Sequence, residues 1–371
     1  MTTHQTPTRR TQVEIYWPKP LGVIICLGLA LLTTWSQDIY TNDLIYPPSV
    51  GIVLIIIGSL LYVSLIWREI RFGDWRLYVP LLVIAVSIAL SGILNGRAIS
   101  DATVALGMVA LFLFAQREAK ALSKFFMWFT IASAAGVVAF QVVNPGVRTG
   151  GYLVSVNNYN LIIGVLVLGT LLSPERHRWW LSAVSGAGML LTGSDEGLFV
   201  GAVLVVTMLV KRDWGMKILL PVTVIGIVAV ICTLTGVTQK LYQTTVERVD
   251  AVSEAAGSTT DRNSQLLVAT GYRIGGNWKL DPLRPFGYGY DMTPHNNAVP
   301  HNVALVVIQQ SGVLAVLAWV AVVVYLGAVR KKWYLVVAML ALGVFDCFIW
   351  TQMLPWWIVA VGVTTTPRTN S

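Results

Sequence analysis

The chain has 371 residues, of which 55% are hydrophobic and only 12% charged, with a formal net charge of +8. Soluble domains carry about 25% charged residues, so this composition excludes that class and indicates a polytopic membrane protein. The apolar runs have helical length, and the alternating segments of about ten residues that mark an outer-membrane barrel are not seen. The basic clusters alternate with connections poor in lysine and arginine, which indicates cytoplasmic loops and not a nucleic-acid-binding surface.

The predicted fold is all-α, a polytopic helical bundle with about twelve transmembrane helices and one large periplasmic loop containing short helices. Residues 1–20 form a polar tail, and the apolar run after it has no signal-peptidase site, so we predict a retained first helix. Helices one to nine fall within 21–235, the periplasmic loop within 236–301, helices ten to twelve within 302–365 and a second tail within 366–371. The individual spans are expected at 21–35, 50–67, 77–94, 102–115, 125–143, 159–172, 179–192, 197–210, 217–235, 302–329, 333–350 and 354–365.

The basic clusters also predict the topology. Counting inward and outward from them places both termini in the cytoplasm without an exception. The longest outward connection, 236–301, contains an amphipathic stretch at 238–255 and a second candidate helix from Arg262 to about Tyr272. The remaining outward connections are 36–48, 95–101, 144–158, 193–196 and 351–353.

The tryptophans at the ends of the apolar runs and the cysteines inside them have simple expected roles. Tryptophans near the ends of spans are expected in the interfacial belts: Trp179, Trp180, Trp356 and Trp357. The cysteines stand singly inside apolar segments, so we expect neither a disulfide framework nor a metal site: Cys26, Cys232 and Cys347.

Two short apolar runs flank the turn at 192–197. Each has about fourteen apolar residues, or ~21 Å of helix, against a hydrocarbon core of ~30 Å. If neither run extends through its flanking residues, Asp195 and Glu196 lie below the outer surface, beside a water-filled cavity. Alternatively, Asp195 caps the helix that starts at Glu196 near the interface. The sequence leaves both interpretations open.

The stretch from Arg284 to Gly312 carries most of the candidate chemistry. It begins as a loop, R-P-F-G-Y-G-Y, whose glycines permit tight backbone conformations and whose aromatic side chains offer faces and hydroxyls to a sugar. It ends as an apolar helix with His301-Asn302 at the junction, nine residues before Gly312. A neutral imidazole can accept the proton of a hydroxyl or orient that hydroxyl by a hydrogen bond.

The pattern His301-Asn302, nine residues, Gly312 resembles the signature of the bacterial O-antigen ligase and polysaccharide polymerase superfamily. The preceding P-F-G-Y-G-Y is similar to that family's P-x-x-G-x-G, and Arg262 stands where an arginine is often found early in the large periplasmic loop. G-G-Y-L-V-S-V-N-N-Y-N resembles the family's glycine-then-Asn-Asn entry to a middle helix. L-T-G-S-D-E-G-L-F-V-G resembles its L-T-x-S-R-G segment, with Asp195 in place of the arginine. The resemblance covers roughly residues 148–365.

The resemblance implies transfer of a glycan from a polyprenyl-pyrophosphate carrier to a hydroxyl of a glycan or lipid A-core acceptor, at the periplasmic face of the bacterial inner membrane. His301 and Arg262 are the expected catalytic residues, because a fixed arginine stabilises the charge that grows on the leaving pyrophosphate. The further substrate-binding candidates are Arg284, Arg148, Arg273, Asn302, Tyr288, Tyr290, Asn158, Asp195 and Glu196. We expect no metal or other cofactor. The expected partners are the lipid bilayer, the glycan substrates and proteins such as a chain-length regulator or a flippase, and not nucleic acid.

Two reactions remain open within this assignment. A polymerase joins repeat units on the lipid carrier, whereas a ligase transfers the finished glycan to its acceptor. The His-Asn…Gly spacing favours a ligase, and the missing Ser-Arg favours a polymerase by a small margin. A transporter or flippase of lipid-linked sugars would concentrate ionisable residues near mid-membrane, and a non-catalytic assembly factor would tolerate the loss of His301 and Arg262.

Overall fold

The computed structural model describes residues 18–34, 49–70, 74–153, 159–193, 200–201, 271–274, 277–280, 285–287, 303–345 and 354–365. Apart from one small hairpin, its regular elements in these residues are helical. The helices are α1 (Pro18–Thr34), α2 (Ser49–Ile66), α3 (Trp75–Leu94), α4 (Ala98–Arg117), α5 (Ala119–Val143), α6 (Tyr159–Leu172), α7 (Arg178–Leu191), α12 (Val303–Val324), α13 (Trp333–Phe345) and α15 (Leu354–Thr364). Three short turns adjoin them: η1 (Trp67–Glu69), η2 (Glu175–His177) and the π-helical turn η4 (Tyr325–Val329).

Four described segments are long and apolar enough to cross a bilayer: Trp75–Leu94, Ala98–Arg117, Ala119–Val143 and Val306–Val329. Five further helices, α1, α2, α6, α13 and α15, are apolar but shorter. The helical membrane class is therefore confirmed at this level. The full set of about twelve spans stays a prediction, because 217–235 and most of 197–210 lie outside the described residues.

The helix ends that were predicted to face the cytoplasm bond to one another. Tyr325 donates its hydroxyl proton to Asp74 over 3.0 Å, Tyr78 donates to Gln116 over 2.5 Å, and the Gln116 amide donates to Thr365 over 3.4 Å. Helix α3 begins in this region, and α4, η4 and α15 finish there. We call this region the basic end. Three arginines border it: Arg76, Arg117 and Arg330. Similar bonds join the end of α2 to the start of α5, and the start of α7 to the start of α13.

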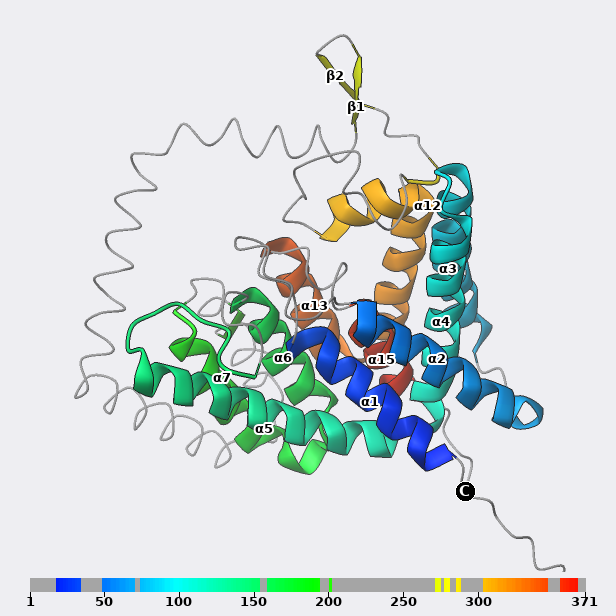
Figure 1. Cartoon of the computed structure of the whole chain (residues 1–371). Helices are drawn as coiled ribbons and strands as arrows, with labels where there is room; N and C mark the ends of the chain where they lie inside the picture. The colour runs from blue at the N-terminus through cyan, green and yellow to red at the C-terminus, as the bar shows by residue number, and fades with distance from the viewer. Residues whose placement is uncertain are drawn as a thin grey trace, which may run out of the picture.

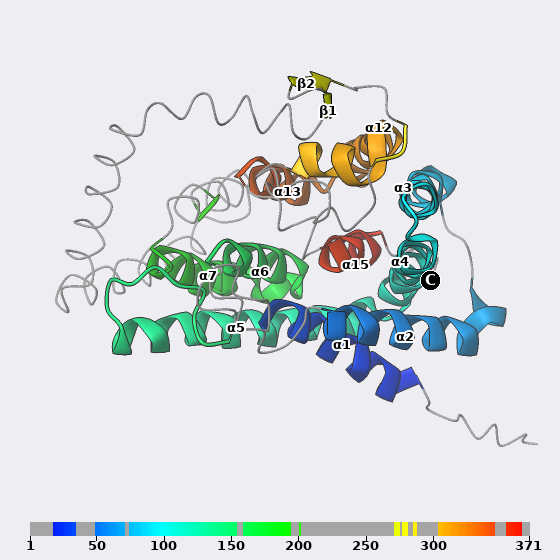
Figure 2. The same ribbon diagram turned by 45° about the horizontal axis from the view of Figure 1, so that its top comes forward.

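The helices are stacked in layers, and α15 lies inside the stack. Figure 2 shows α5, α1 and α2 below, α7, α6 and α15 in the middle, and α13 and α12 above, with α3 and α4 beside them. α15 packs on α4, α5 and α6 and is almost wholly buried, as its central place in Figure 1 suggests. A short helix that is apolar on every side needs such a setting.

The interfacial prediction for the tryptophans of α15 is wrong. The side chains of Trp356 and Trp357 are 0% and 2% exposed. The Trp356 ring lies 5.0 Å from the ring of Phe126 and 5.6 Å from that of Phe129, both on α5. Because aromatic side chains bury large areas, these contacts place α15 in the core and not at a membrane surface.

The large loop contains a β-hairpin. Strand β1 (Gly271–Ile274) pairs antiparallel with β2 (Asn277–Leu280), and Figure 1 shows the hairpin apart from the helices. The expected helix from Arg262 to about Tyr272 is therefore wrong at its end, because Gly271 and Tyr272 belong to β1. Gly275-Gly276 separates the strands in the sequence, and a Gly-Gly pair between two strand-like runs is a hairpin signal.

Candidate functional site

The structure describes two of the predicted site residues. Arg148 is half-buried, and Arg273 lies in β1 opposite Trp278 with only its backbone described. The other candidates lie outside the described residues: His301, Arg262, Arg284, Asn302, Tyr288, Tyr290, Asn158, Asp195 and Glu196. Two described segments adjoin them in the sequence, since Pro285–Gly287 stands between Arg284 and Tyr288, and α12 begins directly after Asn302.

Helix α12 is interrupted at Gly312. The backbone there has φ 80° and ψ 178°, a region open essentially to glycine alone. Figure 1 shows the consequence, because the first part of α12 runs across the top of the bundle while the second part runs down beside α3. The expected helix at 302–329 is thus confirmed in extent, but it consists of two pieces joined at Gly312.

The Pro285–Gly287 segment lies against this interruption. A Cβ atom added to Gly312 would fall 2.6 Å from the Phe286 nitrogen and still closer to the Pro285 carbonyl. A Cβ atom added to Gly287 would fall 2.5 Å from the Gln310 carbonyl oxygen and overlap that of Gln309. The two backbones therefore touch at two points where only glycine fits. Both glycines belong to the motifs that carry the family resemblance.

The end of α3 bonds to both sides of this contact. The Ser91 hydroxyl donates to the Gln310 carbonyl over 2.8 Å, and both residues are buried. The Asn95 amide donates to the Ser91 carbonyl over 2.6 Å and to the Gly287 carbonyl over 3.2 Å. We call the assembly of Ser91, Asn95, Pro285–Gly287 and Gln309–Gly312 the loop end, because it lies at the opposite end of α3 from the basic end.

The loop end contains buried polar atoms without partners. The Gln309 and Ser311 side chains are 1% and 0% exposed, and neither Gln309 Oε1 nor Ser311 Oγ has a hydrogen-bond partner in the part of the chain that the structure describes. Each such atom costs about 1–3 kcal/mol when it stays unpaired. A break inside a helix also leaves backbone carbonyl and amide groups without their intrahelical partners. The loop end therefore holds two buried polar atoms that the described residues leave unpaired.

A buried carboxylate lies close to the loop end. Asp101, in the first turn of α4, is 3% exposed and accepts a hydrogen bond from the Ser100 hydroxyl over 3.1 Å. Its carboxylate group packs directly on Gly92 of α3, the residue after Ser91. A carboxylate is favoured at a helix N-terminus, so Asp101 supports the α3–α4 turn electrostatically and sterically.

Arg148 belongs to a second group of helix ends. The Gln141 amide donates to the carbonyls of Val147 (2.6 Å) and Leu191 (2.8 Å), and the Thr149 nitrogen donates to the Thr192 carbonyl over 3.0 Å. These bonds fasten the loop that carries Arg148 to the end of α7. That end leads within a few residues to Asp195, which itself lies outside the described residues. The start of the predicted outward connection 144–158 is thus held at the end of α7, directly before the predicted connection 193–196.

Sequence reasoning missed Ser91, Asn95, Asp101 and Gln309. The run Gln309-Gln310-Ser311 inside an apolar helix was a usable signal, because polar residues within a span are costly and often functional. Ser91 and Asn95 gave no comparable signal, since their partners lie far away in the sequence.

The described residues contain no group of three or more His, Cys, Asp or Glu side chains that could hold a metal ion. Comparison of the chain with protein-family models, with curated proteins and with solved structures gave no match.

Proposed function

We propose that this chain is a membrane glycosyltransferase of the O-antigen ligase and polymerase type. It transfers a glycan from a polyprenyl-pyrophosphate carrier to a sugar hydroxyl during surface polysaccharide synthesis, and we favour the repeat-unit polymerase reaction. The observation that supports this most is the contact between Pro285–Gly287 and the break of α12 at Gly312. Gly287 and Gly312 belong to two motifs that resemble the family in sequence, and the segments around these two glycines, 25 positions apart, meet there through backbone contacts.

The anchored Pro285–Gly287 segment suggests how substrate groups would be held. Arg284 precedes it and Tyr288 follows it in the sequence. A guanidinium group binds phosphate oxygens in a bidentate manner, and a fixed cation lowers the barrier as charge grows on the leaving pyrophosphate. Arg262 has the same proposed role from the large loop. A rigid attachment of the loop would hold its arginine in place with little cost in conformational entropy.

His301 is the proposed group at the acceptor. It stands two residues before the start of α12, whose first residue, Val303, is buried and packs on Gly343 of α13. In the proposed reaction its neutral imidazole takes the proton from the acceptor hydroxyl while that oxygen attacks the anomeric carbon. The bond from that carbon to the pyrophosphate breaks, and the carrier pyrophosphate leaves.

The predicted topology favours a transfer reaction at the outer face of the membrane. The positive-inside rule assigns the basic end to the cytoplasm, and this assignment puts the loop end on the periplasmic side of the inner membrane. A lipid-linked donor would then reach the loop end from the bilayer. The polar sugar chain would stay in water.

The break in α12 also favours a second candidate, a transporter or flippase of lipid-linked sugars, because interrupted helices form substrate sites in many transporters. Such a protein moves the donor across the membrane without breaking the bond to the carrier. The ligase reaction is the third candidate, and it differs from the polymerase in the product that its loss leaves behind.

The glycan profile of a strain lacking the protein separates these candidates. The strain is complemented with wild type, with His301→Ala or with His177→Ala, a control at η2 whose ring accepts a hydrogen bond from Trp180. We expect wild type and His177→Ala to restore long glycan, and His301→Ala at equal expression to leave single repeat units. Full-length polymer retained on the carrier would indicate a ligase. Restoration of long glycan by His301→Ala would remove the catalytic assignment.

A further inference from the structure

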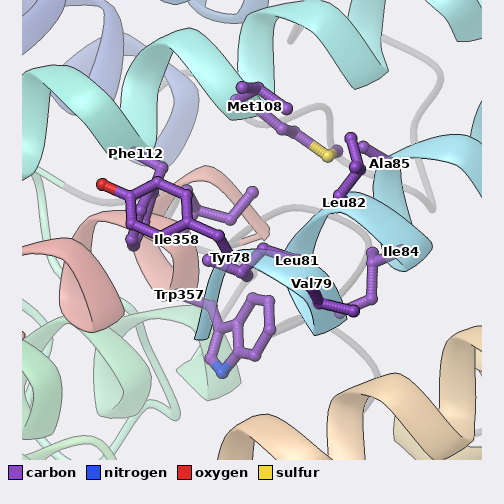
Figure 3. Close-up of a pocket in the computed structure, with 11 residues that line it drawn as sticks. Tyr78, Val79, Leu81, Leu82, Ile84, Ala85, Met108, Phe112, Trp357 and Ile358 are labelled. Carbon is purple, nitrogen blue, oxygen red and sulfur yellow. The ribbon is translucent and has the colours of Figure 1, made fainter. Parts of the chain in front are cut away.

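An apolar groove of about 220 Å³ lies between α3, α4 and α15 (Figure 3). Its walls come from one face of α3, including Val79, Leu82 and Ala85, and from Met108 and Phe112 of α4. Trp357 and Ile358 of α15 complete it. An apolar cavity of about 150 Å³ holds a molecule the size of benzene, so this groove is large enough for part of a hydrocarbon chain.

The groove is open along the outside of two membrane-spanning helices. On its outer rim Val79 and Leu82 are 50% and 56% exposed, while Trp357 and Ile84 in its floor are each 2% exposed. α3 and α4 are both long and apolar enough to cross a bilayer. The medium that meets this opening is therefore the hydrocarbon of the membrane, and an acyl chain is the molecule that fills it.

One end of the groove is polar and basic. The Tyr78 hydroxyl donates to Gln116, whose amide donates to Thr365, so a short chain of polar groups closes the groove at the basic end. Arg76 is exposed and lies one helical turn before Val79, on the same side of α3. Arg117 is also exposed and directly follows Gln116. Two cations thus stand at the polar end of an apolar groove, and the neighbouring carboxylates, Asp74 and Glu118, each accept a hydrogen bond from a tyrosine hydroxyl. With Arg330, the cations outnumber these carboxylates, so this end is complementary in charge and polarity to an anionic lipid.

We propose that this groove binds an anionic phospholipid, with one acyl chain between α3 and α4 and the phosphate beside Arg76 and Arg117. The guanidinium groups bind the phosphate oxygens, and the chain replaces disordered bilayer lipid in the groove. The site is at the basic end, away from the loop end, so the proposal does not depend on the transferase assignment.

The test uses the full-length protein in nanodiscs with phosphatidylglycerol that carries a photoreactive diazirine in its acyl chain, and with phosphatidylcholine that carries the same chain. After irradiation, mass spectrometry maps the labelled residues. We expect phosphatidylglycerol to label the groove residues of α3 and α4 in preference to exposed apolar residues outside the groove, such as Val86 and Leu106. Unlabelled phosphatidylglycerol should compete, and unlabelled phosphatidylcholine should compete weakly.

Two variants and a control sharpen this test. Arg76→Gln should weaken labelling by phosphatidylglycerol about fivefold, since one cation near a membrane surface contributes about 1 kcal/mol. Leu82→Trp should block the groove from its exposed rim without disturbing the core. Arg176→Gln removes an arginine of η2, which contributes nothing to the groove lining, and should have no effect. The proposal would be overturned if the two lipids labelled the protein equally, or if the label spread evenly over α3 and α4. It would also be overturned if neither Arg76→Gln nor Leu82→Trp changed the labelling.

Discussion

Helices α3 and α12 meet at two ends, and the two contacts are of different kinds. At the basic end, where η4 continues α12, the contact includes a bond between side chains, from the Tyr325 hydroxyl to Asp74. At the loop end Ser91 of α3 donates to the Gln310 carbonyl of α12, and the backbone of α12 there also touches that of the Pro285–Gly287 segment, at Gly287 and Gly312. Side chains can be exchanged at modest cost, whereas a backbone contact fixes the residue type. The loop end is therefore the part of this interface with the least freedom to vary.

The largest effect is expected for Gly312→Ala. The new Cβ atom would overlap the Pro285 carbonyl in a backbone conformation that costs about 1–3 kcal/mol for other residues, so we expect a loss of at least about 3 kcal/mol or failure to fold. Thermal unfolding followed by size-exclusion chromatography of the solubilised protein measures this. Gly96→Ala is the matched control, because Gly96 has φ 74° but no atom within 4 Å of an added Cβ. An equal loss in both variants would show that the Pro285 contact contributes nothing.

Gly287→Ala should follow, with a loss of about 2–3 kcal/mol, since its Cβ atom would push the loop away from the Gln309 and Gln310 carbonyls. The same unfolding assay is used. The control is Gly22→Ala in α1, where the nearest atom, on Phe114, would lie at an ordinary 3.8 Å, and little change is expected. A stability of Gly287→Ala equal to that of the control would contradict the close contact.

Asn95→Ala should cost about 1–3 kcal/mol, because it leaves the Gly287 carbonyl without this donor. If Asn95 also positions the loop, the glycan chains in the complemented strain should become shorter. The shortening should be greater than in a variant with the same loss of stability. Asn144→Ala, at the corresponding position after α5, is the control. Normal glycan from Asn95→Ala at normal stability would mean that the bond does not position the site.

Tyr325→Phe should cost about 1 kcal/mol, as expected for one partly buried hydrogen bond. Glycan length should stay normal, because the change lies at the basic end. A large loss of glycan in Tyr325→Phe at unchanged stability would remove the distinction between the two ends.

The smallest effect on stability is expected for Gln309→Met. This change replaces a buried amide whose Oε1 has no described partner with an apolar side chain of similar size, so the thermal midpoint should stay the same or rise slightly. Long glycan should nevertheless be lost if the loop end binds a polar substrate. Unchanged glycan with a higher midpoint would show that Gln309 has no role in binding.

The sequence predicted the helices well, because each long apolar run has one dominant solution in a membrane. The expected spans at 50–67, 77–94 and 159–172 agree with α2, α3 and α6 to within two residues, whereas α4 and α5 begin four and six residues before their expected starts at 102 and 125. The basic clusters also predicted which helix ends lie on the same side of the bundle. The hydrogen bonds between helix ends at the basic end agree with that prediction.

Contacts between distant segments could not be predicted in the same way. The break at Gly312 depends on packing against Pro285–Gly287, and the Ser91–Gln310 bond joins residues 219 positions apart, so neither leaves a local pattern. For α15, a uniformly apolar sequence does not reveal whether lipid or protein surrounds it, and the belt prediction for Trp356 and Trp357 failed for that reason. Gly275-Gly276 was a usable signal for the hairpin, and the helix expected from Arg262 to about Tyr272 did not take it into account.

The most direct test of the central claim is transfer of a radiolabelled oligosaccharide from a synthetic polyprenyl-pyrophosphate donor in proteoliposomes, with EDTA present because no metal requirement is expected. Wild type should convert the donor to longer lipid-linked glycans, and His301→Ala should leave it unchanged. The account would be contradicted if the intact donor moved across the bilayer and no longer product formed. It would also be contradicted if His301→Ala converted the donor as well as wild type does.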